Sequence, residues 1–160
     1  MLEWLSKNYF GEIHVSTGMT TKDEIETLVN FFKSHNRHKD LVLYNCTSGY
    51  PVPFEDVCLL DINLLMDNYK SDVKHIGFSG HHLGIAVDIA AFTLGANVIE
   101  RHYTLDRTWK GTDHAASLEP MGLRKLSRDL HAVHKALSYK NEDILPIEQE
   151  QRQKLKNQKV

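Results

Sequence analysis

Short apolar runs and amphipathic stretches alternate along the 160-residue chain. The apolar runs lie near 12–17, 41–46, 74–79 and 97–102, and each has the length of a buried strand. A stretch with apolar residues at helical spacing follows each run, at 21–36, 62–69, 84–95 and 118–138. Thr21 and Glu24 match the capping-box pattern at the start of the first such stretch. The alternation predicts four β/α units.

Strands that are apolar on both faces favour an α/β fold in which helices cover a parallel sheet. A complete (β/α)8 barrel has about 250 residues, so the pattern predicts a half barrel of the TIM-barrel type or an open four-stranded sheet. We expect this domain to span residues 1–140. The segment 141–160 is rich in charge and glutamine and predicts a solvated tail or the start of a linker.

Polar residues gather where the predicted strands end. Every strand has at least one: Ser16, Thr17, Asn45, Thr47, Ser48, Ser79, His81 and His102. The carboxyl ends of parallel strands meet at one edge, which is the usual ligand-binding face of β/α folds. Alternatively, such residues only end strands and cap helices. Four strands that end alike favour a binding site.

His81 and His102 follow adjacent predicted strands, so their imidazoles are expected close enough to share a divalent cation. Two histidines leave coordination positions for water and substrate oxygens, as a Lewis-acid site requires. In the alternative, the histidines only form hydrogen bonds, or His82 points inwards in place of His81. Arg101 and Arg107 fit either a phosphate clamp or a structural ion pair.

Charge and cysteine content narrow the partners and the compartment. Lys and Arg number 19 and Asp and Glu 21, and this near balance gives no electrostatic reason to bind nucleic acid or anionic lipid. A small polar ligand fits better. No apolar run approaches the roughly 18 residues of a membrane span, and the N-terminus does not resemble a signal peptide. Cys46 and Cys58 are expected to be free thiols, which favours the cytoplasm.

Three long motifs occur in order along the chain: STGMTTKDEIE, NCTSGYPVPFEDVCL and GFSGHHLGIAVDIAAFTLGANVIERHYTLDRTWKGTDHAASLEP. From about residue 13 to residue 137 the chain resembles the second half of the catalytic barrel of the N-acetylneuraminate (sialic acid) synthase family. The antifreeze-like domain of that family has no counterpart in this sequence. The resemblance implies a metal-assisted condensation of phosphoenolpyruvate with N-acetylmannosamine or a related amino sugar. The implied metal is Mn²⁺ or Mg²⁺.

The resemblance also implies site residues. The family's metal ligands match His81 of the G-F-S-x-H motif and His102 of the E-R-H motif. Four positions match substrate-binding residues, which are Ser48 and Ser79 for phosphoenolpyruvate and Tyr50 and Asp113 for the sugar. Asn45 stands where histidine or glutamine is common in the family. We assign no catalytic acid or base from the sequence.

The acidic residue of the family's first strand and its phosphate-binding lysines have no counterpart in this sequence. One hypothesis is that the chain is part of a synthase, completed by a separately encoded first half barrel or by homo-oligomerisation. An open half barrel leaves two strand edges unpaired and exposes apolar interior side chains, which favours such association. The alternative is a non-catalytic half barrel that binds metal or sugar phosphate, or serves in assembly.

Overall fold

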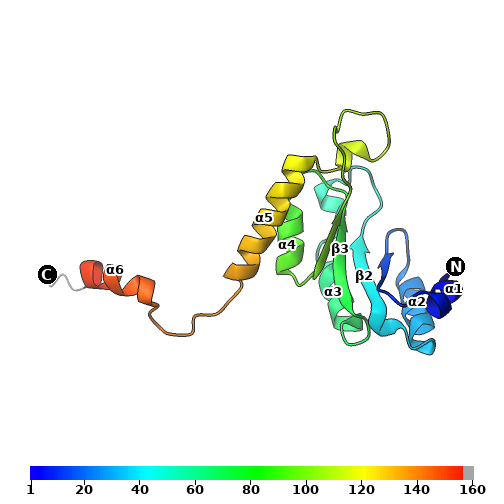
Figure 1. Ribbon diagram of the computed structural model, residues 1–160, viewed down its shortest axis with the longest axis horizontal. Coiled ribbons are helices and arrows are strands. Elements are labelled where there is room, and N and C mark those ends of the chain that lie inside the picture. The colour runs from blue at the N-terminus through cyan, green and yellow to red at the C-terminus, as the bar shows by residue number, and fades with distance from the viewer. Residues whose placement is uncertain (157–160) are drawn as a thin grey trace.

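A parallel four-stranded sheet forms the centre of the computed structural model, which describes residues 1–156 (Figure 1). The strands lie side by side in chain order: β1 (Ile13–Ser16), β2 (Leu41–Cys46), β3 (His75–Gly80) and β4 (Val98–Arg101). All three neighbouring pairs are parallel, and the sheet curls into half of a barrel. The predicted strands and the predicted half barrel are therefore confirmed.

A helix follows each strand; the first three helices cover the same face of the sheet, and the fourth packs against the third (Figure 1). These helices are α2 (Lys22–Ser34), α3 (Asp61–Tyr69), α4 (Ala86–Thr93) and α5 (Pro120–Ala136). The predicted capping box is present at the start of α2. The backbone N–H of Glu24 donates to the Thr21 hydroxyl, and the backbone N–H of Thr21 donates to the Glu24 carboxylate.

The hydrophobic core lies between the sheet and the helices. Ile13, Leu43 and Phe78 contribute alternate side chains from three strands, and Phe32 and Ile62 pack against them from α2 and α3. Each of these five residues is at most 5% exposed. Because strand side chains alternate between faces, the intervening residues point away from the helices.

The face of the sheet that points away from the helices is the inner face, and it is mainly polar. Its residues on the four strands are His14, Ser16, Val42, Tyr44, Cys46, His75, Gly77, Ser79, Val98 and Glu100. The sequence predicted exposed apolar side chains on this face. That prediction is wrong for most of the face, because most of its residues are polar and the apolar Val42 is fully buried. Polar side chains can instead face a ligand or an opposing set of strands.

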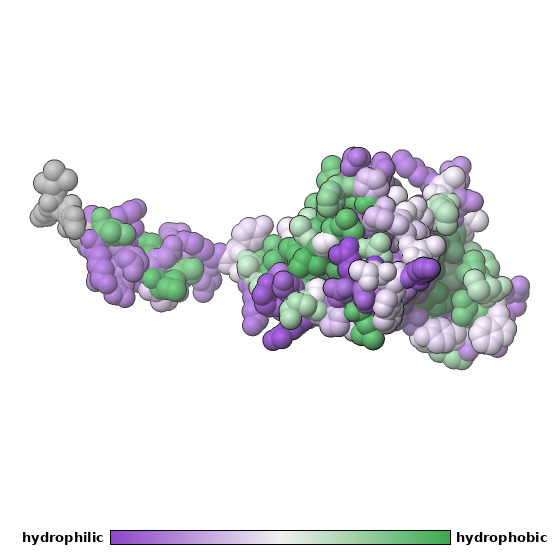
Figure 2. Space-filling model, turned by 90° about the horizontal axis from the view of Figure 1, so that it is seen from above, coloured by the Kyte–Doolittle hydropathy of each residue, from purple (hydrophilic) through white to green (hydrophobic). Residues whose placement is uncertain are grey.

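Two helices lie outside the β/α units. The sequence did not predict α1 (Leu2–Asn8), which Arg37 holds by donating to the carbonyl oxygens of Ser6 and Gly11, both at 3.1 Å. Helix α6 (Pro146–Lys156) stands apart from the sheet and has a largely polar surface (Figures 1 and 2). It belongs to the predicted tail, whose residues 157–160 lie outside the described part. Within residues 1–156, no helix is long and apolar enough to cross a membrane.

Candidate functional site

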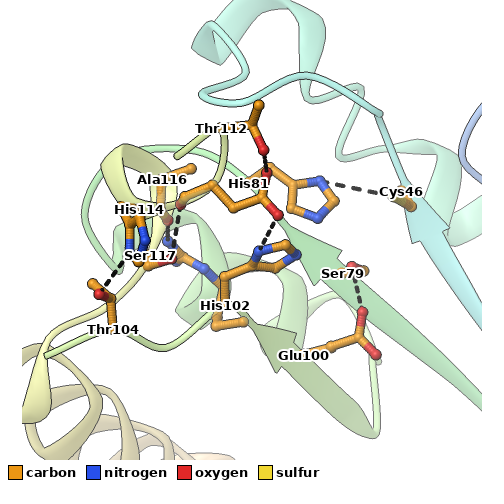
Figure 3. A network of polar contacts seen from close by, with 12 residues as sticks. Cys46, Ser79, His81, Glu100, His102, Thr104, Thr112, His114, Ala116 and Ser117 are labelled. Atoms are coloured by element: carbon orange, nitrogen blue, oxygen red, sulfur yellow. Dashed lines mark hydrogen bonds and ion pairs between the residues drawn. The ribbon is translucent and has the colours of Figure 1, made fainter. Parts of the chain in front are cut away.

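The carboxyl ends of β3 and β4 bring His81 and His102 together. The centroids of the two imidazole rings are 5.0 Å apart, and the ring planes are nearly perpendicular, at 88°. The rings lie side by side in Figure 3, each beyond the end of its own strand. His81 is buried and His102 is partly exposed, so the pair lies at the mouth of the half barrel.

A hydrogen bond orients the His81 imidazole, and a carboxylate lies at ion-pair distance from the His102 imidazole. His81 Nδ1 lies 3.0 Å from the carbonyl oxygen of Thr47, which only accepts, so Nδ1 of the neutral ring carries the proton. His102 Nδ1 lies 3.5 Å from Asp113 Oδ2. In both rings this arrangement directs Nε2 away from the orienting group, as is usual for histidines that bind metals.

The two imidazoles fit a divalent cation as neutral nitrogen ligands, because each keeps an Nε2 lone pair. Among residues 1–156, no group of three or more His, Cys, Asp or Glu side chains is arranged to hold a metal ion. The protein would thus supply two ligands, and water or substrate oxygens would fill the other positions.

Cys46 extends from the end of β2 to the same place, with Sγ at 3.9 Å from His81 Nδ1. The hydrogen bond with Cys46 raises the pKa of His81 above its ordinary value, and the bond with Thr47 adds to this although burial opposes it. Burial raises the pKa of the Cys46 thiol, but hydrogen bonds with His81 and Ser16 outweigh it and lower the pKa. The two groups therefore favour each other's charged form. Both Cys46 and Cys58 are free thiols, as expected.

Tyr50 and Asp113 lie next to the histidine pair. The Tyr50 ring is 4.5 Å from the His81 ring and 5.7 Å from the His102 ring, measured between centroids. A cavity of about 480 Å³ opens beside His102, and its other lining residues are Tyr103, Gly111, Thr112, Asp113, His114 and Ser117. Asp113 thus contacts a histidine and faces a space that can hold a small polar molecule.

Ser79 lies on the inner face, two residues before His81. Its hydroxyl donates to Glu100 Oε1 at 2.7 Å, and the two residues are partners in the strand register (Figure 3). Sequence reasoning missed Glu100. Its position two residues before His102 was the available signal, because alternate strand residues share a face.

Ser48 directly follows Thr47, whose carbonyl oxygen bonds to His81, and Asn45 lies near the end of β2. Ser48 packs against Gly18 in the loop after β1, where a Cβ would collide with the serine hydroxyl. Asn45 faces the helices, with Nδ2 at 3.4 Å from the Cys58 carbonyl oxygen, so it does not lie on the inner face with the histidine pair. The structure therefore groups Tyr50, His81, His102 and Asp113 through contacts with the two imidazoles, and Ser79 is the register partner of Cys46, which contacts His81.

His82 does not face the site. It is fully buried on the helix side of β3, and its Nε2 lies 3.4 Å from Asp88 Oδ2. The alternative in which His82 replaces His81 at the site is therefore wrong. Arg107 donates to the Ala115 carbonyl oxygen at 2.6 Å, so it braces the loop after β4.

The fold and the site define a half barrel of parallel β/α units with two histidines at the carboxyl ends of adjacent strands. Residues 1–142 match the NeuB family, and the chain belongs to this family.

Curated relatives carry the names of sugar-acid synthases. The chain is 42% identical over 141 residues to the N-acetylneuraminate-9-phosphate synthase of Homo sapiens, an alignment that covers 88% of this chain and 38% of that protein. It is 42% identical over 127 residues to the N,N'-diacetyllegionaminic acid synthase of Campylobacter jejuni, covering 79% of this chain and 37% of the relative. The chain thus spans well under half the length of these relatives.

Solved structures show the same arrangement of elements. The N-acetylneuraminic acid synthetase of Leptospira borgpetersenii superposes with a TM-score of 0.74 at 34% identity, over 91% of this chain and 50% of that one. A spore coat polysaccharide biosynthesis protein of Bacillus subtilis has a TM-score of 0.75 at 22% identity, over 89% of this chain and 40% of that one, and supports the fold alone.

Proposed function

We propose that the chain is the metal-binding and sugar-binding part of a synthase that joins phosphoenolpyruvate to an N-acetylated amino sugar. One water molecule is also consumed, and the products are a nonulosonic acid and phosphate. The observation that carries the proposal is the meeting of His81, His102, Tyr50 and Asp113 at the strand ends. The names of the two relatives described above, both synthases of sugar acids, support the same reaction class.

In this proposal, His81 and His102 hold Mn²⁺ or Mg²⁺ through their Nε2 atoms. The ion would polarise the aldehyde oxygen of the sugar for attack by the enol carbon. Thr47 and Asp113 keep the imidazoles in the required tautomer and orientation by binding their Nδ1 atoms. Asp113, which lines the cavity beside His102, and Tyr50, whose ring centroid lies 5.7 Å from that of His102, accept and orient sugar hydroxyl groups.

Ser48 and Ser79 are the proposed contacts for phosphoenolpyruvate. Phosphate and carboxylate oxygens only accept hydrogen bonds, whereas Ser79 already donates its single proton to Glu100. Binding at Ser79 therefore requires the hydroxyl to rotate away from Glu100. The inner-face residues of the four described strands include no lysine or arginine to balance the charge of phosphoenolpyruvate.

We infer that the missing cationic groups come from a partner set of β/α units or from a second copy of the chain. The same observation favours a second candidate function, in which the half barrel binds metal or sugar phosphate without catalysis. Addition of the complementary half distinguishes the two, because only the first candidate gains phosphate release.

Calorimetric titration with Mn²⁺ tests the metal site. His81→Ala and His102→Ala should each abolish measurable binding, because one remaining imidazole does not retain the ion. His131→Ala is the matched control, since His131 is exposed on α5 and should leave binding unchanged. Wild-type affinity in both His81→Ala and His102→Ala would place the ion elsewhere and remove the basis of the proposal.

A further inference from the structure

A buried polar cluster lies behind the histidine pair, on the helix side of the sheet. It consists of His82, Asp88 and Arg101, whose side chains are 0%, 0% and 2% exposed. Arg101 Nη1 donates to Asp88 Oδ2 at 2.5 Å and lies 3.2 Å from His82 Nε2. A buried ion pair thus joins β4 to α4.

The Arg101 guanidinium also binds three backbone carbonyl oxygens. Two belong to the loop after β3, His82 and Gly84, each at 2.8 Å. The third is Ala116 at 3.3 Å, the last residue of the short helix η3 (His114–Ala116). One side chain therefore connects β4, the loop after β3, α4 and η3.

The backbone groups that Arg101 binds lie close to the site residues in the sequence. Arg101 immediately precedes His102, and His82 immediately follows His81, so the two members of each pair point to opposite faces. Helix η3 follows Asp113, whose carboxylate contacts His102. Arg101 thus holds, on the helix side, backbone segments that directly adjoin His81, His102 and Asp113.

The composition of the cluster favours positioning over stabilisation. Burial of an ion pair removes both charges from water, and well-packed apolar side chains often stabilise a core as well. Within residues 1–156, Asp88 Oδ1, His82 Nδ1 and Arg101 Nε also find no hydrogen-bond partner among protein groups. Such a cluster breaks a local rule of core design, as residues that fix a functional geometry often do.

We propose that Arg101 is a positioning residue that sets the separation and the mutual orientation of His81 and His102. The geometric part of this inference stands on the contacts above, and its consequence for metal affinity rests on the proposed function. A lysine keeps the charge but lacks the planar set of donors that reaches a carboxylate and three carbonyl oxygens together. Arg101→Lys should therefore loosen the pair without removing a ligand.

Two measurements on the 160-residue chain test the inference. The first needs no metal: an NOE between ring protons of His81 and His102 should be present in the wild type, whose ring centroids are 5.0 Å apart, and lost in Arg101→Lys. The second is Mn²⁺ affinity, which should fall about 10- to 100-fold, as when an outer group that orients a ligand is removed. Asp88→Asn, which keeps the shape of the cluster, should act in the same direction.

Ile62→Val is the matched control, because Ile62 is a fully buried residue of α3 on the helix side of the sheet. It should lower thermal stability but keep both the NOE and the Mn²⁺ affinity. An unchanged NOE in Arg101→Lys and Asp88→Asn overturns the inference.

If Arg101→Lys does not fold, the result for Asp88→Asn decides. If neither variant folds, the cluster serves folding and the inference is wrong. A wild-type protein that shows the NOE but binds no Mn²⁺ contradicts the proposed metal site alone.

Discussion

At the scale of single residues, Tyr44 shows how the inner face is built around polar groups. Its hydroxyl lies 2.6 Å from His14 Nδ1, and the residue is only 3% exposed. Its ring covers Gly77 on the next strand, where a Cβ would lie 2.7 Å from the ring carbons. A glycine at position 77 therefore lets a large aromatic side chain lie flat in the middle of the sheet.

The position of Tyr44 predicts an unusually weak phenol acid. Burial raises the pKa of Tyr44 to about 12, and the negative charges of Glu100 and Glu12 add to the effect. In an ultraviolet titration of phenolate, this group should ionise last and its step should disappear in Tyr44→Phe. If Tyr44→Phe kept the ionisation step near pH 12 and lost a step near pH 10, the assignment of the high-pH step to Tyr44 would be wrong.

The same shift makes stability depend on alkaline pH. Between about pH 10 and pH 12 the unfolded chain has lost the Tyr44 proton while the folded chain retains it, so the unfolded state binds fewer protons. The contribution of this group is fully present below pH 10 and is lost as pH rises through 12. In chemical denaturation, the free energy of unfolding of the wild type should fall more steeply between about pH 10 and pH 12 than that of Tyr44→Phe, which lacks the titrating group.

At the scale of elements, the strands were predictable because each is a short apolar run whose side chains are buried on the helix side. The adjacency of His81 and His102 followed from strand order in the same way. Helix α1 was not predictable, because its backbone partner Arg37 lies far away in sequence. The sequence analysis did not predict that Asn45 points towards the helices, because a position near the end of a strand does not say on which face of the sheet a side chain lies.

The loop between β4 and α5 was the least predictable part of the site. Its shape depends on contacts within a polar segment that has no periodicity, such as Thr104 Oγ1 to His114 Nδ1 at 2.8 Å. The backbone N–H of Leu118 also donates to the His102 carbonyl oxygen at 2.8 Å, which returns the loop to the strand end. The motif resemblance placed Asp113 in the site, whereas hydrophobic patterning contained no signal for it.

The capping box of α2 gives a test at this scale. Thr21→Ala removes the hydroxyl that accepts from the Glu24 N–H, and should lower the free energy of unfolding by about 1 kcal/mol. Thr21→Ser keeps an accepting hydroxyl and is the control, with nearly wild-type stability. Urea denaturation measures both variants. Equal destabilisation by serine and alanine would mean that the threonine methyl group matters and the cap does not.

At the scale of the whole molecule, the sheet has two open edges. Within residues 1–156, β1 and β4 each pair with one neighbouring strand, so each has backbone N–H and C=O groups without a strand partner there. A closed barrel removes both edges, and the matched Leptospira borgpetersenii chain is twice as long as the part that this chain covers. Four further β/α units or a second copy would cover the same edges and face the polar inner surface.

This incomplete surface predicts that the 160-residue chain alone releases little or no phosphate from phosphoenolpyruvate and an N-acetylated amino sugar, whatever its metal content. Its inner-face strand residues supply carboxylate, hydroxyl, thiol and imidazole groups but no lysine or arginine, so an anionic substrate lacks charge partners there. General acid–base catalysis alone contributes a factor of roughly 10² to 10⁴ in rate, and the sequence of this chain assigns no catalytic acid or base.

A coupled phosphate assay should show activity only after a complementary first half barrel of the NeuB family is added. The same mixture made with His102→Ala is the control and should stay inactive. Turnover of about 1 to 10³ per second by the chain alone would mean that these four strands suffice.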